Sequence, residues 1–139
     1  MTVPAGGPRR VLVATVRMRV RSEKRDEFVQ AMADLTARTR RAAGCIASHL
    51  YADGEEPGVF TLVEEWRGRR DLDRHLASDE FAALIGAGFL LEGPAEITLD
   101  AVARRGGTDE VLRRRADVAR SDWQGRHPRP PRAGFPTEP

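Results

Sequence analysis

The chain has 139 residues, of which 40% are hydrophobic and 32% charged, with 23 basic and 21 acidic side chains. This length suffices for one domain with a proper core and is too short for two ordinary domains, and the hydrophobic content excludes a wholly disordered chain. No apolar run approaches the roughly 18 residues of a membrane span, and the opening MTVPAGGPRR lacks the apolar core of a signal peptide. We therefore expect a cytoplasmic protein without a membrane partner.

The excess of basic charge lies at the end of the chain. Residues 1–103 carry 14 Arg and Lys against 16 Asp and Glu, whereas residues 104–139 carry 9 against 5. A nucleic-acid surface would place basic residues, with aromatic side chains among them, along the folded body. We expect no nucleic-acid partner. We also expect no metal site, because the chain contains a single cysteine and neither a CxxC nor an HExxH spacing.

The first predicted elements are a strand and a helix. Residues 11–20 alternate between two faces and include β-branched side chains, which predicts a strand. Ser22 is a predicted N-cap, because acidic residues follow it in the first turn, and Gly44 can close the helix in the left-handed conformation. We expect an amphipathic helix of about 18 residues between them, with an apolar stripe at Phe28, Ala31, Met32 and Leu35.

A hairpin follows, with strands over residues 45–53 and 59–67 and the turn GEEPG between them. If Asp53 pairs with Val59, alternation divides the side chains between two faces. One face then holds Ile46, Ser48, Leu50, Ala52, Phe60, Leu62, Glu64 and Trp66. The other holds Cys45, Ala47, His49, Tyr51, Val59, Thr61, Val63 and Glu65.

The pattern ends with a helical region over about residues 70–85, broken by a new N-cap at Ser78, and a strand over residues 96–103. The order β-α-β-β-α-β predicts an α+β, ferredoxin-like fold with one antiparallel sheet covered by helices on one face. The uncovered face is too apolar for water, since it includes Val11, Val13, Tyr51, Val59 and Val63. A homodimer packed sheet against sheet is the simplest way to cover it.

The two ends of the chain lie outside this domain, which we place at residues 11–103. Residues 1–10 are rich in Gly, Pro and Arg and are predicted to be flexible. Residues 104–139 form an Arg/Pro-rich extension, with a short helix predicted over about 108–120. The proline-rich remainder is predicted to be disordered.

Three side chains are aimed at one layer between sheet and helices. Glu64 follows Phe60 and Leu62 on the helix-facing side of its strand, where a carboxylate must be hydrogen-bonded or line a pocket. His75 shares a helical stripe with Leu72 and Leu76, which must face the sheet. The two periodicities therefore predict that Glu64, Trp66 and His75 meet.

Both a structural and a functional interpretation of this cluster are open. His75 is either a hydrogen-bonded core residue or a catalyst, and Trp66 either packs in the core or stacks on a substrate. Glu64 can orient the imidazole under either interpretation. His49 and Tyr51 point to the opposite face and are predicted to lie in the dimer interface, and Cys45 is predicted to be an inert small apolar residue.

The stretches FTLVEEW and LDRHLASDEF, with E-x-W followed by His nine residues after the Trp, resemble the antibiotic biosynthesis monooxygenase domain. The similarity covers about residues 11–102. It implies a dimeric α+β barrel with a pocket between sheet and helices in each subunit. Relatives include monooxygenases that oxidise quinols, anthrones and related aromatic molecules with dioxygen and without a cofactor.

For this chain the resemblance implies a small aromatic substrate, dioxygen as co-substrate and no cofactor. His75 is the expected base or anion-orienting donor, oriented by Glu64. The expected substrate-binding residues are Trp66, Phe60, Leu62, Leu72 and Phe81. Haem degradation is not expected, because Val16, His75 and Ile85 stand where haem-degrading relatives have Asn, Trp and His. Glu80 occupies the place where many quinol-oxidising relatives carry a second histidine.

The sequence also admits a second function from another class. A non-catalytic dimeric module of the same fold, binding a small aromatic molecule, would use Glu64 and His75 as a structural pair. Replacing either residue would then lower stability more than it alters ligand binding.

Overall fold

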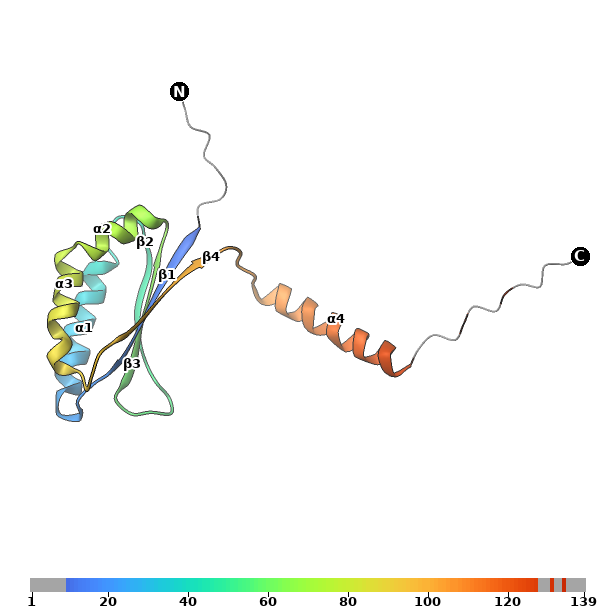
Figure 1. The fold of residues 1–139 in the computed structure, drawn as a ribbon, viewed down its shortest axis with the longest axis horizontal. Coiled ribbons are helices and arrows are strands. Elements are labelled where there is room, and N and C mark those ends of the chain that lie inside the picture. Colours follow the sequence, from blue (N-terminus) through green and yellow to red (C-terminus); the bar gives the residue numbers. More distant parts are fainter. Residues whose placement is uncertain (1–9, 128–130, 132–133, 135–139) are drawn as a thin grey trace, which may run out of the picture. The chain divides into compact units, whose positions relative to one another are not determined.

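The computed structural model describes residues 10–127, 131 and 134 (Figure 1). The chain divides into two compact units, Met1–Ala103 and Arg104–Pro139. The predictions of flexibility before residue 10 and of disorder in the proline-rich end fall mainly on residues outside the described part. Within that part, no helix is both long enough and apolar enough to cross a bilayer.

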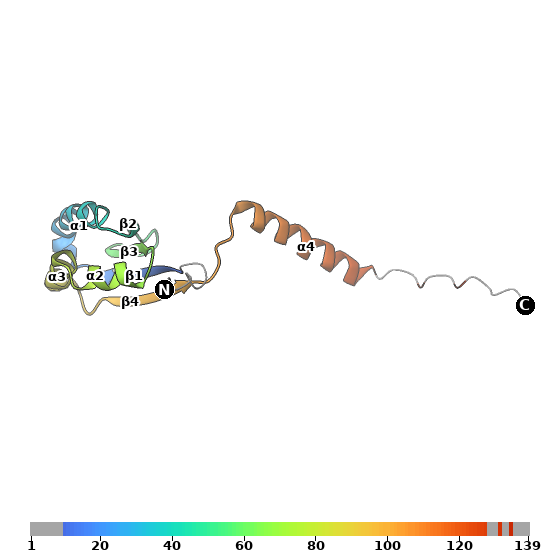
Figure 2. The same cartoon turned by 90° about the horizontal axis from the view of Figure 1, so that it is seen from above.

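The first unit is a four-stranded antiparallel sheet with helices on one face, which confirms the predicted α+β, ferredoxin-like fold. Its main elements are β1 (Val11–Arg19), α1 (Arg25–Thr39), β2 (Cys45–Ala52), β3 (Val59–Trp66), α2 (Arg69–Leu76), α3 (Asp79–Gly86) and β4 (Glu96–Val102). Short 3₁₀ turns are η1 (Ser22–Lys24) and η2 (Ala87–Leu90). The strand order is β2-β3-β1-β4. Figure 2 shows α1 and α3 on the same side of the sheet.

The N-terminal end of α1 differs from the prediction. Ser22 starts the 3₁₀ turn rather than the α-helix, and its hydroxyl contacts Glu23 instead of capping a backbone amide. The helix has 15 residues, from Arg25, with Lys24 at the N-cap position. Asp26 and Glu27 thus lie in the first turn of α1 and Glu23 lies in η1, and the helix begins two residues later than Ser22 indicated.

Gly44 has the predicted left-handed conformation, with a φ of 81°. It precedes β2 in the chain and lies close to both the end of β3 and the side chain of Asp71 in α2. Its carbonyl oxygen accepts a hydrogen bond from the amide of Arg67, 2.9 Å away. A Cβ atom at this position would lie 2.1 Å from the side-chain Cγ of Asp71. Glycine is therefore required here both by the backbone conformation and by the close approach of α2.

A β-bulge corrects one predicted facing. Cys45 pairs with Trp66 and Ala47 with Glu65, so that Ile46 is an extra residue between them. The sequence placed Cys45 on the face opposite Trp66, and this is wrong because the inserted residue reverses the alternation. Cys45 lies on the helix-facing side, whereas Ile46, predicted to face the helices, is 45% exposed.

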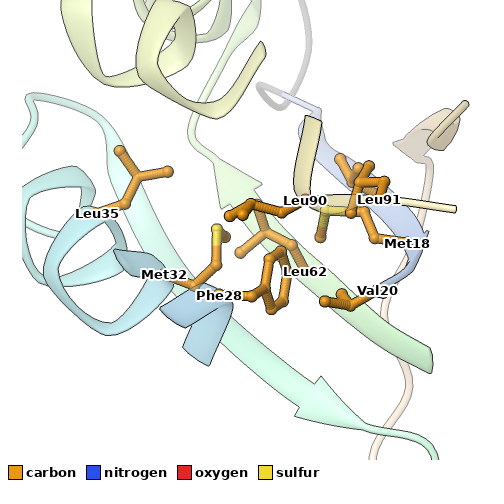
Figure 3. Packing of buried hydrophobic residues seen from close by; sticks show 9 residues of the cluster. Met18, Val20, Phe28, Met32, Leu35, Leu62, Leu90 and Leu91 are labelled. Carbon is orange, nitrogen blue, oxygen red and sulfur yellow. The ribbon is translucent and has the colours of Figure 1, made fainter. Parts of the chain in front are cut away.

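The hydrophobic core lies between α1, η2 and one half of the sheet (Figure 3). Its buried residues are Val16, Met18, Val20, Phe28, Met32, Leu35, Leu62, Leu90 and Leu91. Phe60 packs beside it, with its ring centroid 5.1 Å from that of Phe28. In the other half of the sheet, Leu12 pairs with Trp66 and Ala14 with Glu64, so the candidate site and the core occupy different stretches of β1 and β3.

The face of the sheet that carries no helix is partly apolar, as the alternation predicts. Val11, Val13 and Val63 are half-buried there and Tyr51 is exposed. Val59 is an exception to the predicted exposed set, because it is only 1% exposed within the single chain. This face therefore leaves apolar area in contact with water in the isolated subunit.

The described residues of the second unit contain one helix, α4 (Thr108–Arg126). It extends about six residues beyond the predicted end near residue 120. The extension has a simple cause, since a helix that has started gains one hydrogen bond per added residue and the first proline after it is Pro128. None of its residues is buried.

Candidate functional site

The structure brings Glu64, Trp66 and His75 together. Glu64 lies on β3 and His75 on α2, and their Oε2 and Nε2 atoms are 3.0 Å apart. The indole Nε1 of Trp66 donates a hydrogen bond of 3.2 Å to the same carboxylate oxygen. Glu64 is 5% exposed, His75 7% and Trp66 0%. The predicted meeting of these three side chains is thus found, and both polar contacts of Glu64 are screened from bulk water.

Two aromatic rings hold the imidazole of His75. The ring of Trp66 stacks on it with centroids 4.5 Å apart and an interplanar angle of 28°. Phe81 approaches edge-on at 5.8 Å. An indole face attracts a positive charge, so Trp66 and Glu64 would both stabilise an imidazolium formed at His75.

The side chain of Ser78 is hydrogen-bonded to the backbone of both His75 and Phe81. Its hydroxyl accepts a hydrogen bond from the amide of Phe81, 3.2 Å away, as the predicted N-cap of α3. The same hydroxyl donates to the carbonyl oxygen of His75 at the end of α2. The break between α2 and α3 therefore fixes His75 relative to Phe81.

The contact with Glu64 bears on the form of the imidazole. Because an ionised carboxylate only accepts hydrogen bonds, the tautomer of neutral His75 that suits this 3.0 Å contact carries its hydrogen on Nε2. The other ring nitrogen, Nδ1, is then the atom of neutral His75 that can take up a proton. The pair can therefore act as an oriented base.

Two further polar side chains share this side of the sheet. Ser48 pairs with Glu64 across the ladder, is fully buried, and its hydroxyl has no hydrogen-bond partner among the described residues. Burial raises the pKa of the Cys45 thiol, and the negative charge of Glu64 raises it further. The sequence missed Ser48 as a site residue, although alternation placed it beside Glu64. Alternation along the strand could not predict that Cys45 lies beside Glu64, because this position depends on the bulge.

The Cys45 thiol gives a readout of the charge on Glu64. Because a raised pKa leaves less thiolate at a given pH, Cys45 should react with iodoacetamide more slowly at pH 8 than a free thiol. Glu64→Gln removes the neighbouring negative charge, which should lower the thiol pKa and accelerate alkylation. Mass spectrometry over a pH series measures both rates. Equal rates in the two proteins would contradict this arrangement of Cys45 and Glu64.

Two hollows adjoin the cluster. The first, the small hollow, has a volume of about 230 Å³ and is lined by Thr39, Ala42, Ala43, Trp66, Asp71, Arg74, His75, Ser78 and Glu80. The second, the apolar hollow, has about 550 Å³ and is lined by Val16, Met18, Arg21, Phe81, Leu84, Ile85, Gly88, Leu91, Gly93, Pro94, Ala95 and Ile97. Apolar cavities of about 150 Å³ take up benzene, so the small hollow has room for a substituted single ring.

The predicted substrate-binding residues divide into two groups. Trp66 lines the small hollow and Phe81 the apolar hollow. Phe60, Leu62 and Leu72 do not line either of these two hollows; Leu62 belongs to the core and Leu72 is 2% exposed. A role for these three residues in substrate binding stays a prediction. Within the described residues, no group of three His, Cys, Asp or Glu side chains is placed to hold a metal ion.

Comparison with known proteins finds sequence relatives of the first unit. The family model described as antibiotic biosynthesis monooxygenase matches residues 11–87. An uncharacterised protein of Synechocystis is 30% identical over 93 residues, which cover 66% of this chain and 63% of the relative. The match thus spans less than two thirds of that relative's length.

Several solved structures are similar to the first unit in both fold and sequence. A conserved protein of Methanosarcina mazei is 28% identical with a TM-score of 0.63, and the match covers 66% of this chain and 91% of that one. The crystal structure of an antibiotic biosynthesis monooxygenase is 26% identical with a TM-score of 0.62, covering 67% and 99%.

Proposed function

Because the chain belongs to the antibiotic biosynthesis monooxygenase family, we propose that it is a cofactor-independent monooxygenase that oxidises a small electron-rich aromatic molecule with dioxygen. The observation that carries this proposal is the buried Glu64–His75 pair, joined at 3.0 Å and lying beside a hollow of single-ring size. Without a cofactor, the electrons that reduce dioxygen would come from the substrate itself.

The first step is removal of a proton from the bound aromatic. Dioxygen in its ground state is a triplet and reacts slowly with closed-shell molecules, but an electron-rich anion can transfer one electron to it. An ordinary phenol has a pKa near ~10 and an ordinary imidazole one near ~6.5, so this transfer costs about 5 kcal/mol. Hydrogen bonding to the anion, and a more acidic substrate, reduce that cost.

In this proposal Nδ1 of His75 accepts the proton, Glu64 holds the resulting imidazolium through Nε2, and Trp66 stacks on its face. Trp66 is thus a positioning residue, and direct stacking of Trp66 on the substrate stays a prediction. Superoxide then combines with the substrate radical to give a peroxide. For an anthrone-type CH₂ group, cleavage of the O–O bond leaves a carbonyl oxygen on the product and releases the second oxygen atom as water.

The test is oxygen uptake by metal-free, flavin-free protein with a panel of quinols and anthrones, after subtraction of each compound's autoxidation. Uptake should saturate with substrate, and His75→Ala should lower the saturated rate by about 10²- to 10⁴-fold. His127→Ala is the matched control, because His127 is an exposed residue that follows α4 in the other unit.

Unchanged turnover in His75→Ala would refute the assignment of His75. Absence of uptake above background over the whole panel would favour the second function, a non-catalytic module that binds an aromatic molecule. The hydrogen-bonded, stacked state of His75 is compatible with that function as well. Ligand-induced shifts in melting temperature would then be expected with the same panel, and Glu64→Gln would lower stability more than ligand affinity.

We further propose that the protein is a homodimer packed through the helix-free face of the sheet. The half-buried Val13 and Val63 and the exposed Tyr51 on this face support the proposal. Val63→Asp should convert the dimer to a monomer, because an unpaired carboxylate would be desolvated in the interface. Val29→Asp, on α1, is the control, and light scattering over a concentration series measures the mass. A monomeric wild-type protein would refute the proposal.

A further inference from the structure

A third hollow, the arginine hollow, lies beside the small hollow at the start of α2. It has a volume of about 640 Å³, and four of its lining side chains are Arg10, Arg69, Arg70 and Arg74. Leu12 of β1 and Ala101 of β4 complete one wall. Figure 1 shows that the start of α2, the start of β1 and the end of β4 meet at one end of the sheet. Segments far apart in sequence thus bring their arginines to one concave surface.

The charge of this hollow is not balanced by its own residues. Asp71 is the acidic side chain in its lining, and its Oδ1 atom is 3.7 Å from Nη1 of Arg74. The Nε atom of Arg69 is 3.9 Å from Asp73. Both separations exceed the roughly 2.7–2.9 Å of a charge-assisted hydrogen bond. Arg10 and Arg70 have no ion pair among the described residues. Several guanidinium donors are therefore available to a ligand.

The position of these arginines is unfavourable for the helix itself. Arg69 and Arg70 are the first two residues of α2, where the helix dipole disfavours positive charge. The N-cap residue is Gly68, which provides no side-chain hydrogen bond. A bound anion would neutralise this end of the helix and engage the planar guanidinium groups, which match carboxylate and phosphate oxygens. The lining chemistry of the cavity thus indicates an anionic ligand.

The arginine hollow adjoins the candidate site. Asp71 and Arg74 line both the arginine hollow and the small hollow, in which His75 and Trp66 lie. One molecule could therefore place a ring beside His75 and an acidic group among the arginines. We propose that the substrate is an aromatic molecule that bears an anionic group, carboxylate or phosphate, and that Arg10, Arg69, Arg70 and Arg74 bind this group. The inference rests on the proposed function, because it assigns the anion to the same substrate.

The experiment measures binding without turnover, by calorimetry under anaerobic conditions. Homogentisate is compared with its methyl ester, and hydroquinone monophosphate with hydroquinone, so that the carboxylate and the phosphate are tested separately. At least one acid should bind about 10- to 100-fold more tightly than its uncharged partner. The larger of the two preferences identifies the group. Because the arginines are exposed, the preference should shrink as salt is added.

The variants are Arg10→Gln and Arg70→Gln, singly and together, with Arg113→Gln of α4 as a control of equal charge. The ratio of acid to neutral affinity should fall towards one in the double variant and stay at its wild-type value in the control. Circular dichroism verifies that each variant is folded. A wild-type ratio near one for both pairs, a ratio that survives in the double variant, or failure of both acids to bind would overturn the proposal.

Oxygen uptake with the same four compounds separates this inference from the proposed function. A preference for an acid that depends on Arg10 and Arg70, without uptake by any compound, would support the anion site and count against the monooxygenase. Uptake of the neutral compounds, with no preference for the acids, would support the monooxygenase and refute the anion site.

Discussion

Replacing Trp66 with alanine is expected to lower the free energy of unfolding by about 3–5 kcal/mol, the usual cost of removing a large aromatic side chain from a protein interior. Trp66 is 0% exposed and lies between Leu12 and Cys45 in the sheet. Its loss would also remove a hydrogen bond to Glu64 and the ring that stacks on His75. Urea unfolding at a fixed protein concentration measures the change.

The chain contains a matched control for this substitution. Trp123 is 58% exposed on α4, and Trp123→Ala should change the unfolding free energy by less than about 0.5 kcal/mol. Trp66→Phe should cost less than Trp66→Ala, because it keeps one apolar ring and loses the pyrrole ring with its N–H donor. A cost below about 1 kcal/mol for Trp66→Ala would show that this region is not packed as described.

Glu64→Gln is expected to lower the rate of oxygen uptake by about 10²- to 10⁴-fold while leaving the protein folded. Oε2 of Glu64 accepts a hydrogen bond from Nε1 of Trp66 and contacts Nε2 of His75, so glutamine would place its amide oxygen there and keep both contacts. The substitution therefore removes the negative charge that would stabilise the imidazolium formed at His75, and it leaves the tautomer unchanged. Because few atoms change, the loss of rate would report on the charge of Glu64 rather than on packing.

Nitrogen NMR of His75 separates loss of the charge on Glu64 from a change of tautomer. The two imidazole nitrogens should have the shifts of an Nε2–H tautomer in the wild-type protein and should keep them in Glu64→Gln. Glu27→Gln, at an exposed position of α1, should leave both the spectrum and the rate unchanged. Wild-type turnover in Glu64→Gln would refute the orienting role of Glu64.

Periodicity predicted the elements that lie between two layers, because burial imposes one spacing on strands and another on helices. Glu64 and His75 could be aimed at one another for this reason, since each belongs to an otherwise apolar row that must face the opposite layer. The same logic predicted the break at Ser78, whose hydroxyl caps α3. These features depend on the local sequence pattern and on the single assumption that the helices cover one face of the sheet.

Features set by single contacts could not be predicted in this way. The bulge at Ile46 has no marker in composition, and it moved Cys45 to the side of Trp66. Ser22 has the side chain of a helix cap, yet a 3₁₀ turn comes between it and α1. The arginine hollow depends on residues from β1, α2 and β4 meeting at one end of the sheet. Only the tertiary arrangement shows that Arg10 and Arg70 line one cavity.

The bulge also affects how this chain should be aligned with its relatives. A relative with a regular second strand would have one residue fewer between the positions of Gly44 and Ser48. An alignment without a gap there would match Cys45 to a residue that faces the opposite side of the sheet. Placing the gap at Ile46 restores the correspondence of facing, so that residues compared with Cys45 are those that stand beside the Glu64–His75 pair.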